Sequence, residues 1–538
     1  MIKGLLRVVT AVGVFGMPMG LAGQGTPRAV IGNVIFDGDT AQSVATFKGI
    51  PYAKAPVGEL RWRPPVPVQP VPGVHQARSY GPSCMQNDRL VQWIKGIATV
   101  FGTAAKVVAD TLKVSEDCLY LNIWTPRLSS APAPVMVWIH GGSNLNGSGG
   151  ESLYDGTELA RRGVVVVSIN YRLGLFGFMA HPALAAESPN HSAGNYGLLD
   201  QIEALRWVRQ NIRAFGGDPK RVTVFGESAG SIDIIHLMAS PLARGLFDQA
   251  IAESGSPMGR MGTLAMAGGF GKQFAKALGV DTVTNQLAAM RGKSAADILA
   301  AQNNFPGLVL AAGPIVDGWV LTDLTARVFE RGEQAPIPFL IGSNAFEMTT
   351  LRGYLPQFPR TVAGYRQWAG ATLGAASDTV LHYYPAVGDS AVEDAALKLT
   401  TDLYMTCPVR IAARAMKSSG RKTFLYQFTR VVPGGEKLGA YHAAEISFVF
   451  GTKPAWLPLQ QADDQLSKVM MGYWTRFAAT GDPNGRGAIE WFPYGSGRDY
   501  YLELGTPMVV RADLKKEACD AMDPPLKAQW APARAPAQ

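Results

Sequence analysis

The stretch Arg221-Val-Thr-Val-Phe-Gly-Glu-Ser-Ala-Gly-Ser231 decides the fold of this chain. Residues 222–225 are β-branched or aromatic and predict a short buried strand, and residues 229–238 suit a helix. Between them lies Gly226-Glu-Ser-Ala-Gly230, which matches the pattern G-x-S-x-G. Its two glycines lack the Cβ atoms that a sharp turn would bring into collision. The stretch therefore predicts a strand, a tight turn carrying Ser228, and a helix.

Such a turn places the Ser228 hydroxyl at the carboxyl end of a sheet. It also leaves the N–H of Ala229 at a helix N-terminus, where it can bind negative charge that develops on an oxygen. A lone G-x-S-x-G is a weak signal in a chain with 60 glycines. This match is the only one in the sequence, and it falls at a strand-to-helix junction. We therefore interpret Ser228 as a nucleophile.

Composition indicates a large globular protein without a nucleic-acid partner. The chain has 538 residues, of which 47% are hydrophobic and 17% charged, which suits a sizeable core. The net charge of +8 is spread along the chain, with only short basic pairs such as Arg161-Arg162 and Lys515-Lys516. Diffuse charge of this kind favours solubility over nucleic-acid binding. We predict no cofactor and no metal, and the sequence does not predict the oligomeric state.

The N-terminus is typical of a secretory signal peptide. Lys3 and Arg7 precede the apolar run Val8–Leu21, which ends in the small-x-small pattern Gly20-Leu-Ala22. We expect cleavage near Ala22, so that residues 1–22 are removed and the protein is secreted or periplasmic. A transmembrane anchor is a weaker reading because the run is short and contains a proline. No other stretch is long enough to span a membrane, so no stable membrane anchor is predicted.

Strand-like apolar runs alternate with helical spacing along most of the chain. The predicted strands are 119–124, 135–139, 164–169, 222–225, 250–252, 337–341 and 423–428, and the predicted helices include 197–214 and 465–480. This alternation favours an α/β fold with a mostly parallel sheet covered by helices on both faces. Nearer the N-terminus, Val30–Phe36 is followed by Asp37-Gly38, a hairpin signal.

No linker or internal repeat divides the mature chain. Residues 23–523 therefore read as one domain, in which 262–335 and 351–420 are predicted to be helical insertions that form a cap. The segment 524–538 is rich in Pro and Ala and is predicted to be a mobile tail.

The four cysteines are candidates for two disulfides if the chain is exported. Cys84 and Cys118 bracket residues 85–117, whose middle, Leu90–Leu112, is largely apolar and suits one or two amphipathic helices. This segment is either a packed surface excursion or a lid over the site. The sequence leaves both readings open.

Several further motifs accompany the Ser228 turn. They are Phe47–Ala53, Ser115–Asn122, Asn195–Asp200, Phe225–Gly230, Gly342–Glu347 and His442–Gly451. With these motifs, from about residue 28 to 520, the sequence resembles the type-B carboxylesterase and cholinesterase-like family. The resemblance implies an α/β-hydrolase fold and hydrolysis of small-molecule carboxylic esters.

The general base has three candidates, because the order in this fold is serine, acid, histidine, and only His236, His382 and His442 follow Ser228. His236 lies in the helix that leaves the turn, and His382 lies in a predicted insertion helix. His442 lies in a loop soon after the strand 423–428 and matches the histidine of the family. We therefore expect His442 to act as the base.

The acid is expected to be Glu347. It follows the predicted strand 337–341, where a loop residue can point over the carboxyl edge of the sheet. It also matches the family's G-x-N-x-x-E pattern, which favours it over Asp317 and Asp402. Its role would be to hold the imidazole tautomer and stabilise the imidazolium.

The resemblance also implies the oxyanion hole and the disulfide pairing. The stretch Ile139-His-Gly-Gly-Ser143 supplies the amides of Gly142 and Ser143, which would join that of Ala229. Ser143 departs from the family, which usually has glycine or alanine there. The family pattern pairs Cys84 with Cys118. It pairs Cys407 with Cys519 less securely, and two free thiols are the alternative.

Two other functions remain open at this level. The apolar segment between Cys84 and Cys118 would suit a lipase that acts on long-chain esters. Some members of the family are adhesion proteins without catalysis, but these typically lose a catalytic residue, whereas this chain keeps Ser228, Glu347 and His442. The natural ester is not predicted.

Overall fold

The computed structural model describes Met1 and residues 26–69, 71–107, 113–126, 128, 131–354 and 358–530. The strands are β1 Arg28–Ile31, β2 Val34–Asp37, β3 Asp39–Ala41, β4 Val44–Pro51, β5 Gly73–Gln76, β6 Ser83–Cys84, β7 Val114–Ser115, β8 Tyr120–Thr125, β9 Ala133–Ile139, β10 Val165–Ile169, β11 Gly217–Glu227, β12 Gln249–Glu253, β13 Gly262–Thr263, β14 Ile315–Val316, β15 Phe339–Asn344, β16 Thr423–Phe428, β17 Tyr500–Leu504 and β18 Val509–Ala512. The predicted signal peptide lies outside the described residues.

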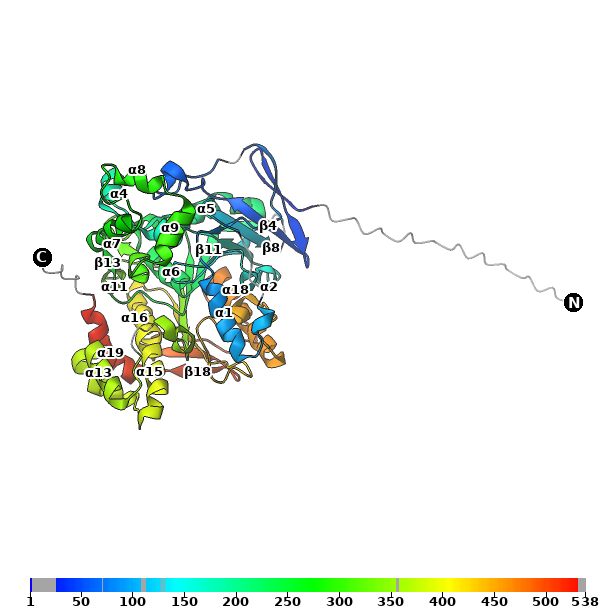
Figure 1. Cartoon of the computed structure of the whole chain (residues 1–538). Helices are drawn as coiled ribbons and strands as arrows, with labels where there is room; N and C mark the ends of the chain where they lie inside the picture. Colours follow the sequence, from blue (N-terminus) through cyan, green and yellow to red (C-terminus); the bar gives the residue numbers. More distant parts are fainter. Residues whose placement is uncertain are drawn as a thin grey trace.

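The helices cover the sheet and build the insertions (Figure 1). They are α1 Arg89–Val100, α2 Thr157–Ala160, α3 Gly174–Phe178, α4 Pro182–Glu187, α5 Tyr196–Asn211, α6 Ala229–Ala239, α7 Leu264–Ala277, α8 Gln286–Arg291, α9 Ala295–Asn303, α10 Leu308–Ala311, α11 Thr325–Glu330, α12 Met348–Leu351, α13 Val362–Leu373, α14 Ser377–Tyr383, α15 Val392–Thr401, α16 Cys407–Ala415, α17 Ile446–Phe450, α18 Gln461–Thr480 and α19 Lys516–Ala528.

Within the described residues, the main sheet has 11 strands in the order β18-β17-β16-β15-β12-β11-β9-β10-β8-β4-β3. The strands from β17 through β10 pair in parallel, and the pairs at both edges are antiparallel. The seven predicted strands all belong to this sheet, and the predicted mostly parallel α/β fold is confirmed.

Strand β9 shows how the sheet separates two cores. Val135, Val137 and Ile139 are buried in the core that contains α5 and α6, while Met136 and Trp138 are buried in the core that contains α18. Alternate side chains of a strand point to opposite faces. A strand covered on both faces must therefore be apolar at every position, which explains the unbroken apolar run that predicted it.

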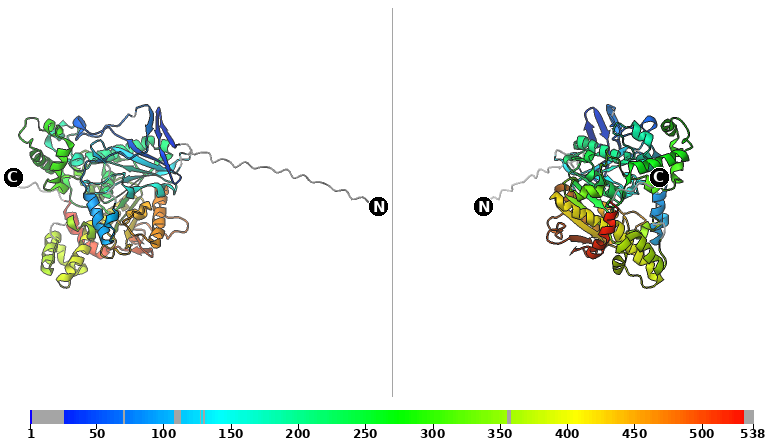
Figure 2. Two further views of the ribbon diagram at one scale, coloured as in Figure 1. Left: turned by 45° about the vertical axis from the view of Figure 1, so that its right-hand side comes forward. Right: turned by 90° about the vertical axis from the view of Figure 1, so that its left-hand side faces the viewer.

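The two insertions are helical, as predicted, but they do not form one cap. Helices α7–α9 lie at one end of the molecule and α13–α15 at the other, in all the views of Figures 1 and 2. Helix α1 lies between these two groups in the same views. Helix α1, in the described part of the Cys84–Cys118 segment, thus lies apart from both insertions.

Two local predictions were wrong. The N-terminal hairpin turns at Gly32-Asn33, where Gly32 has a φ of 57°, and β2 runs through the predicted turn residue Asp37. The tail predicted from Pro524 is helical as far as Ala528, because Leu526 and Trp530 are buried against the body and this packing outweighs the penalty of two prolines inside α19. Residues 531–538 lie outside the described part.

Both expected disulfides are present, Cys84 with Cys118 and Cys407 with Cys519. The first closes the segment that contains α1, and the second joins α16 to α19. Among the described residues, no helix combines the length and the apolar character needed to cross a membrane.

Candidate active site

Ser228 lies in the sharp turn between β11 and α6, with φ 56° and ψ −120°. This left-handed backbone is strained for a residue with a side chain and is typical of a nucleophile turn. A Cβ atom on Gly226 or Gly230 would lie 2.5 Å and 2.0 Å, respectively, from the carbonyl oxygen of Ile139. Only glycine therefore allows the turn to approach β9 this closely.

Glu347 and His442 form the next part of the site. Glu347 follows β15, and its Oε2 lies 2.7 Å from Nδ1 of His442, which is in the loop between β16 and α17. The other oxygen, Oε1, accepts a hydrogen bond of 2.6 Å from the backbone N–H of Asn344. Both side chains are buried. The carboxylate is thus fixed at both oxygens, and it fixes the imidazole in turn.

Four of the predicted site residues line one cavity of about 80 Å³, namely Ser228, His442, Gly142 and Ser143. Ala229 follows Ser228 directly as the first residue of α6. The parallel strands β9, β11 and β15 bring these loops together at their carboxyl ends, the usual position of sites in such sheets.

The loop after β9 packs closely against Ser228. A Cβ atom on Gly141 would lie 3.0 Å from the Cβ of Ser228, and one on Gly142 would lie 2.2 Å from the carbonyl oxygen of Asn146. Ser143 stands where the family usually has glycine or alanine, and with a φ of 59° it has a left-handed backbone. Gly141 and Gly142 are therefore required, because a Cβ atom at either position would come too close to neighbouring atoms.

The alternative candidates have other partners. His236 Nδ1 lies 2.7 Å from the Thr325 hydroxyl, and Asp402 accepts a hydrogen bond from the hydroxyl of Tyr384. Asp317 accepts a hydrogen bond from the hydroxyl of Ser192. Within the described residues, neither these three residues nor His382 lines the cavity.

A group of buried carboxyl groups around His442 was not predicted from the sequence. Glu227 Oε1 lies 3.1 Å from His442 Nε2, and Glu445 and Glu253 are also fully or almost fully buried. Burial raises the pKa of the Glu227 carboxyl well above its usual range, and it raises the pKa of Glu445 to about 7. Glu227 is the first variable residue of G-x-S-x-G and Glu445 closely follows His442, so their positions were the available signal.

The buried carboxyl groups raise the pKa of His442. Burial by itself lowers the pKa of His442, but the charges of Glu227, Glu347 and Glu445 outweigh it and raise the pKa to about 9. The imidazolium is therefore unusually stable in this site. This property suits a histidine that must accept a proton from a weak acid such as a serine hydroxyl.

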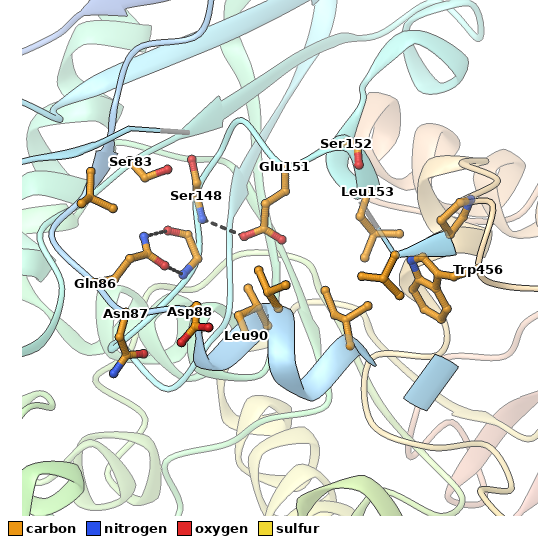
Figure 3. Close-up of a pocket in the computed structure, with 16 residues that line it drawn as sticks. Ser83, Gln86, Asn87, Asp88, Leu90, Ser148, Glu151, Ser152, Leu153 and Trp456 are labelled. Carbon is orange, nitrogen blue, oxygen red and sulfur yellow. Dashed lines mark hydrogen bonds between the residues drawn. The ribbon is translucent and has the colours of Figure 1, made fainter. Parts of the chain in front are cut away.

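A larger pocket of about 340 Å³ lies beside the cavity. The two share five lining residues, which are Leu90, Ile94, Glu151, Leu153 and Trp456. Figure 3 shows Leu90 on α1, together with Leu153 and Trp456, at the border of this outer pocket. The partition between the two spaces is thus mostly apolar and is built by the Cys84–Cys118 segment and two other loops.

The sequence and the fold both match known proteins. Residues 29–522 match the model of the carboxylesterase family. The chain is 38% identical to a fumonisin B1 esterase of Sphingopyxis macrogoltabida, over 82% of this chain and 80% of that one, and 35% identical to a para-nitrobenzyl esterase of Bacillus subtilis, over 89% and 95%. A solved structure of a PNB esterase superposes with a TM-score of 0.79 at 33% identity, covering 92% of this chain and 99% of that one.

Proposed function

The chain belongs to the carboxylesterase family and hydrolyses carboxylic esters, and we propose that it does so through an acyl-enzyme formed on Ser228. The proposal is supported chiefly by the 2.7 Å contact of Glu347 with His442 beside the cavity that Ser228 and His442 share. Nucleophile, base and acid follow one another in the order typical of this fold.

In the first half of the reaction, His442 Nε2 takes the proton of the Ser228 hydroxyl while Oγ attacks the ester carbonyl carbon. The N–H groups of Gly142, Ser143 and Ala229 stabilise the negative oxygen of the tetrahedral intermediate. The bond to the alcohol oxygen then breaks, and the imidazolium gives its proton to the leaving alcohol. Glu347 stabilises the imidazolium throughout.

In the second half, water attacks the acyl group on Ser228, with His442 again as the base. The acid product leaves and the serine regains its proton. Turnover of p-nitrophenyl acetate should therefore begin with a burst of p-nitrophenol equal to the enzyme concentration when deacylation is slower than acylation. An organophosphonate should add covalently to Ser228, and mass spectrometry that maps the adduct to another residue would contradict the mechanism.

The pH profile should follow the raised pKa of His442. Only the neutral imidazole can accept the serine proton, so kcat/KM should rise with pH until the group has lost its proton near pH 9. Replacing Glu227 with glutamine removes a carboxyl group 3.1 Å from Nε2 whose charged form stabilises the imidazolium. The midpoint of the Glu227→Gln profile should then fall by roughly one pH unit or more.

The control for this profile is Glu59→Gln, which removes a carboxylate whose side chain is 82% exposed. This variant should keep the wild-type midpoint. An unchanged midpoint in Glu227→Gln would mean that the Glu227 carboxylate does not act on the base.

The outer pocket supports esters with a longer apolar chain as the preferred substrates. Its volume of about 340 Å³ falls in the range of pockets that bind small molecules, whereas the catalytic cavity holds only about 80 Å³. The shared wall includes Leu90, Ile94 and Leu153, so an apolar chain that extends across it meets apolar side chains. We infer that this pocket takes the distal part of the substrate.

A chain-length series tests this inference. p-Nitrophenyl octanoate should show a higher kcat/KM than the acetate, and Val91→Trp should remove most of that advantage with little effect on the acetate. Val91 lines only the outer pocket, and the exposed neighbour Gln92 lines neither space, so Gln92→Trp is the matched control. Equal losses on both esters in Val91→Trp would contradict the assignment of the pocket.

The same series separates an esterase from a lipase. We expect saturation on dissolved octanoate ester and no increase in rate above its solubility limit. A sharp increase at that limit would favour the lipase reading instead, with the α1 segment as its lid.

Export is proposed from the N-terminal residues 1–22 and is supported by the two disulfides. Disulfides persist in oxidising compartments such as the periplasm and the extracellular medium. Peptide mapping of the protein recovered from outside the cytoplasm should find a new N-terminus near Ala22.

A further inference from the structure

Two consecutive residues of the loop after β9, Ser143 and Asn144, have left-handed backbones, with φ values of 59° and 56°. Both carry side chains, so this conformation costs free energy and persists only where neighbouring contacts impose it. Ser143 is one of the proposed oxyanion donors. The contacts that hold Asn144 therefore also decide where the N–H of Ser143 points.

Asn144 is buried and is held on three sides. Its carbonyl oxygen accepts a hydrogen bond of 2.6 Å from the N–H of Gly174. Its Oδ1 lies 3.1 Å from the hydroxyl of Tyr171, and its Nδ2 donates a hydrogen bond of 3.1 Å to Oδ1 of Asp233. The side chain thus ties the loop to helix α6, on which Asp233 lies.

Asp233 is fully buried, and among the described residues it forms no ion pair. Its second oxygen accepts a hydrogen bond of 2.6 Å from Nε2 of Gln201 on α5. Burial raises the pKa of Asp233 to about 7, although both amide donors lower it. A buried carboxyl group held by two neutral amides lowers stability compared with an apolar residue of the same size. The mechanism above does not use it.

We propose that Asp233 is a positioning residue for the oxyanion hole, acting through Asn144. Helix α6 carries Asp233 and also begins with Ala229, directly after Ser228. The hydrogen bond from Asn144 to Asp233 therefore links the two halves of the oxyanion hole, the amides of Gly142 and Ser143 on one loop and that of Ala229 on the helix. This inference rests on the proposed acyl-enzyme mechanism.

The test replaces the amide nitrogen of Asn144 with an oxygen and leaves Asp233 unchanged. In Asn144→Asp, a carboxylate oxygen replaces the donor and faces the carboxylate of Asp233. Aspartate tolerates a left-handed backbone as asparagine does, so the change is confined to the hydrogen bond and its charge. Oxyanion donors act on the transition state, so kcat for p-nitrophenyl acetate should fall by about 10²–10³-fold. KM should stay within a few-fold of wild type.

The exchanged pair, Asn144→Asp combined with Asp233→Asn, is the matched rescue. The amide at position 233 can donate to the carboxylate at 144 and accept from Gln201, while Tyr171 still donates to position 144. All three side-chain contacts are retained, and the negative charge moves from position 233 to position 144. We expect the exchanged pair to recover kcat to within about tenfold of wild type, since a truly coupled pair is non-additive.

Burst amplitude and phosphonate labelling of Ser228 accompany each measurement. A wild-type enzyme that shows neither a burst nor a Ser228 adduct would overturn the acyl-enzyme mechanism itself. With those intact, a normal kcat in Asn144→Asp, or a loss that appears only in KM, would overturn the positioning role. If Asn144→Asp does not fold, the exchanged pair decides the question. A folded exchanged pair with kcat still about 10²-fold low would overturn the proposal.

Discussion

Ser228→Ala should lower kcat for p-nitrophenyl acetate by about 10⁶-fold, leaving only the residual rate that binding and the oxyanion donors provide. The methyl group cannot attack the ester, and no acyl-enzyme can form. The fold should be unaffected, because alanine at the turn keeps the Cβ atom that the left-handed backbone already accommodates. The measurement is steady-state turnover together with circular dichroism and phosphonate labelling.

Ser231→Ala is the matched control. Ser231 lies on α6, is fully buried, and donates a hydrogen bond of 2.7 Å to the carbonyl oxygen of Gly255. Its loss removes a structural hydrogen bond and should leave kcat within about tenfold of wild type. Turnover by Ser228→Ala at a rate similar to Ser231→Ala would assign the nucleophile to another residue.

Glu347→Gln should cost about 10⁴-fold in kcat, as the loss of a triad carboxylate does in other hydrolases. The reason is the hydrogen bond that the Glu347 carboxylate accepts from the backbone N–H of Asn344. The backbone N–H of Asn344 donates to Oε1 and cannot turn away, so the oxygen of a glutamine must face it. The amide group then faces Nδ1 of His442, which forces the proton onto Nε2. An imidazole in that tautomer cannot accept the serine proton.

The control for the acid is Glu445→Gln. Glu445 is fully buried near the same histidine, but among the described residues its side chain accepts hydrogen bonds from Ser254 and Asn344 and none from His442. This variant should lose far less activity than Glu347→Gln. The opposite ranking would reassign the acid to Glu445, and equal losses would mean that the carboxyl groups act as one unit.

The fold, and the approach of Glu347 to His442 beside the cavity that Ser228 lines, were predictable mainly from signals close to each residue in the sequence. Each central strand is buried on both faces, so an unbroken apolar run such as 135–139 identifies a strand without knowledge of its neighbours. Ser228 was found from two glycines that its own turn requires. Glu347 closely follows β15 and His442 lies in the loop between β16 and α17, and their identities were narrowed by chain order and by the family pattern.

What could not be predicted depends on distant partners. Asn144 and Asp233 are 89 positions apart, and nothing around Asp233 in the run of isoleucines on α6 indicates an amide partner. The helix through Pro524 depends in the same way on where Leu526 and Trp530 find room to be buried. The separation of the two insertions depends on the order of strands in the sheet. The apolar periodicity of the sequence gives no information on that order.

The bond between Cys407 and Cys519 spans 112 positions, whereas that between Cys84 and Cys118 spans 34. For an exported chain that emerges from its N-terminus, the first pair becomes available early and can close while the rest is still crossing the membrane. Cys407 can pair only after Cys519, near the C-terminal end of the chain, has also emerged. Early closure removes the two thiols that could trap Cys407 in a wrong pairing. If the chain is exported as proposed, the order in which the cysteines appear would favour the native connectivity.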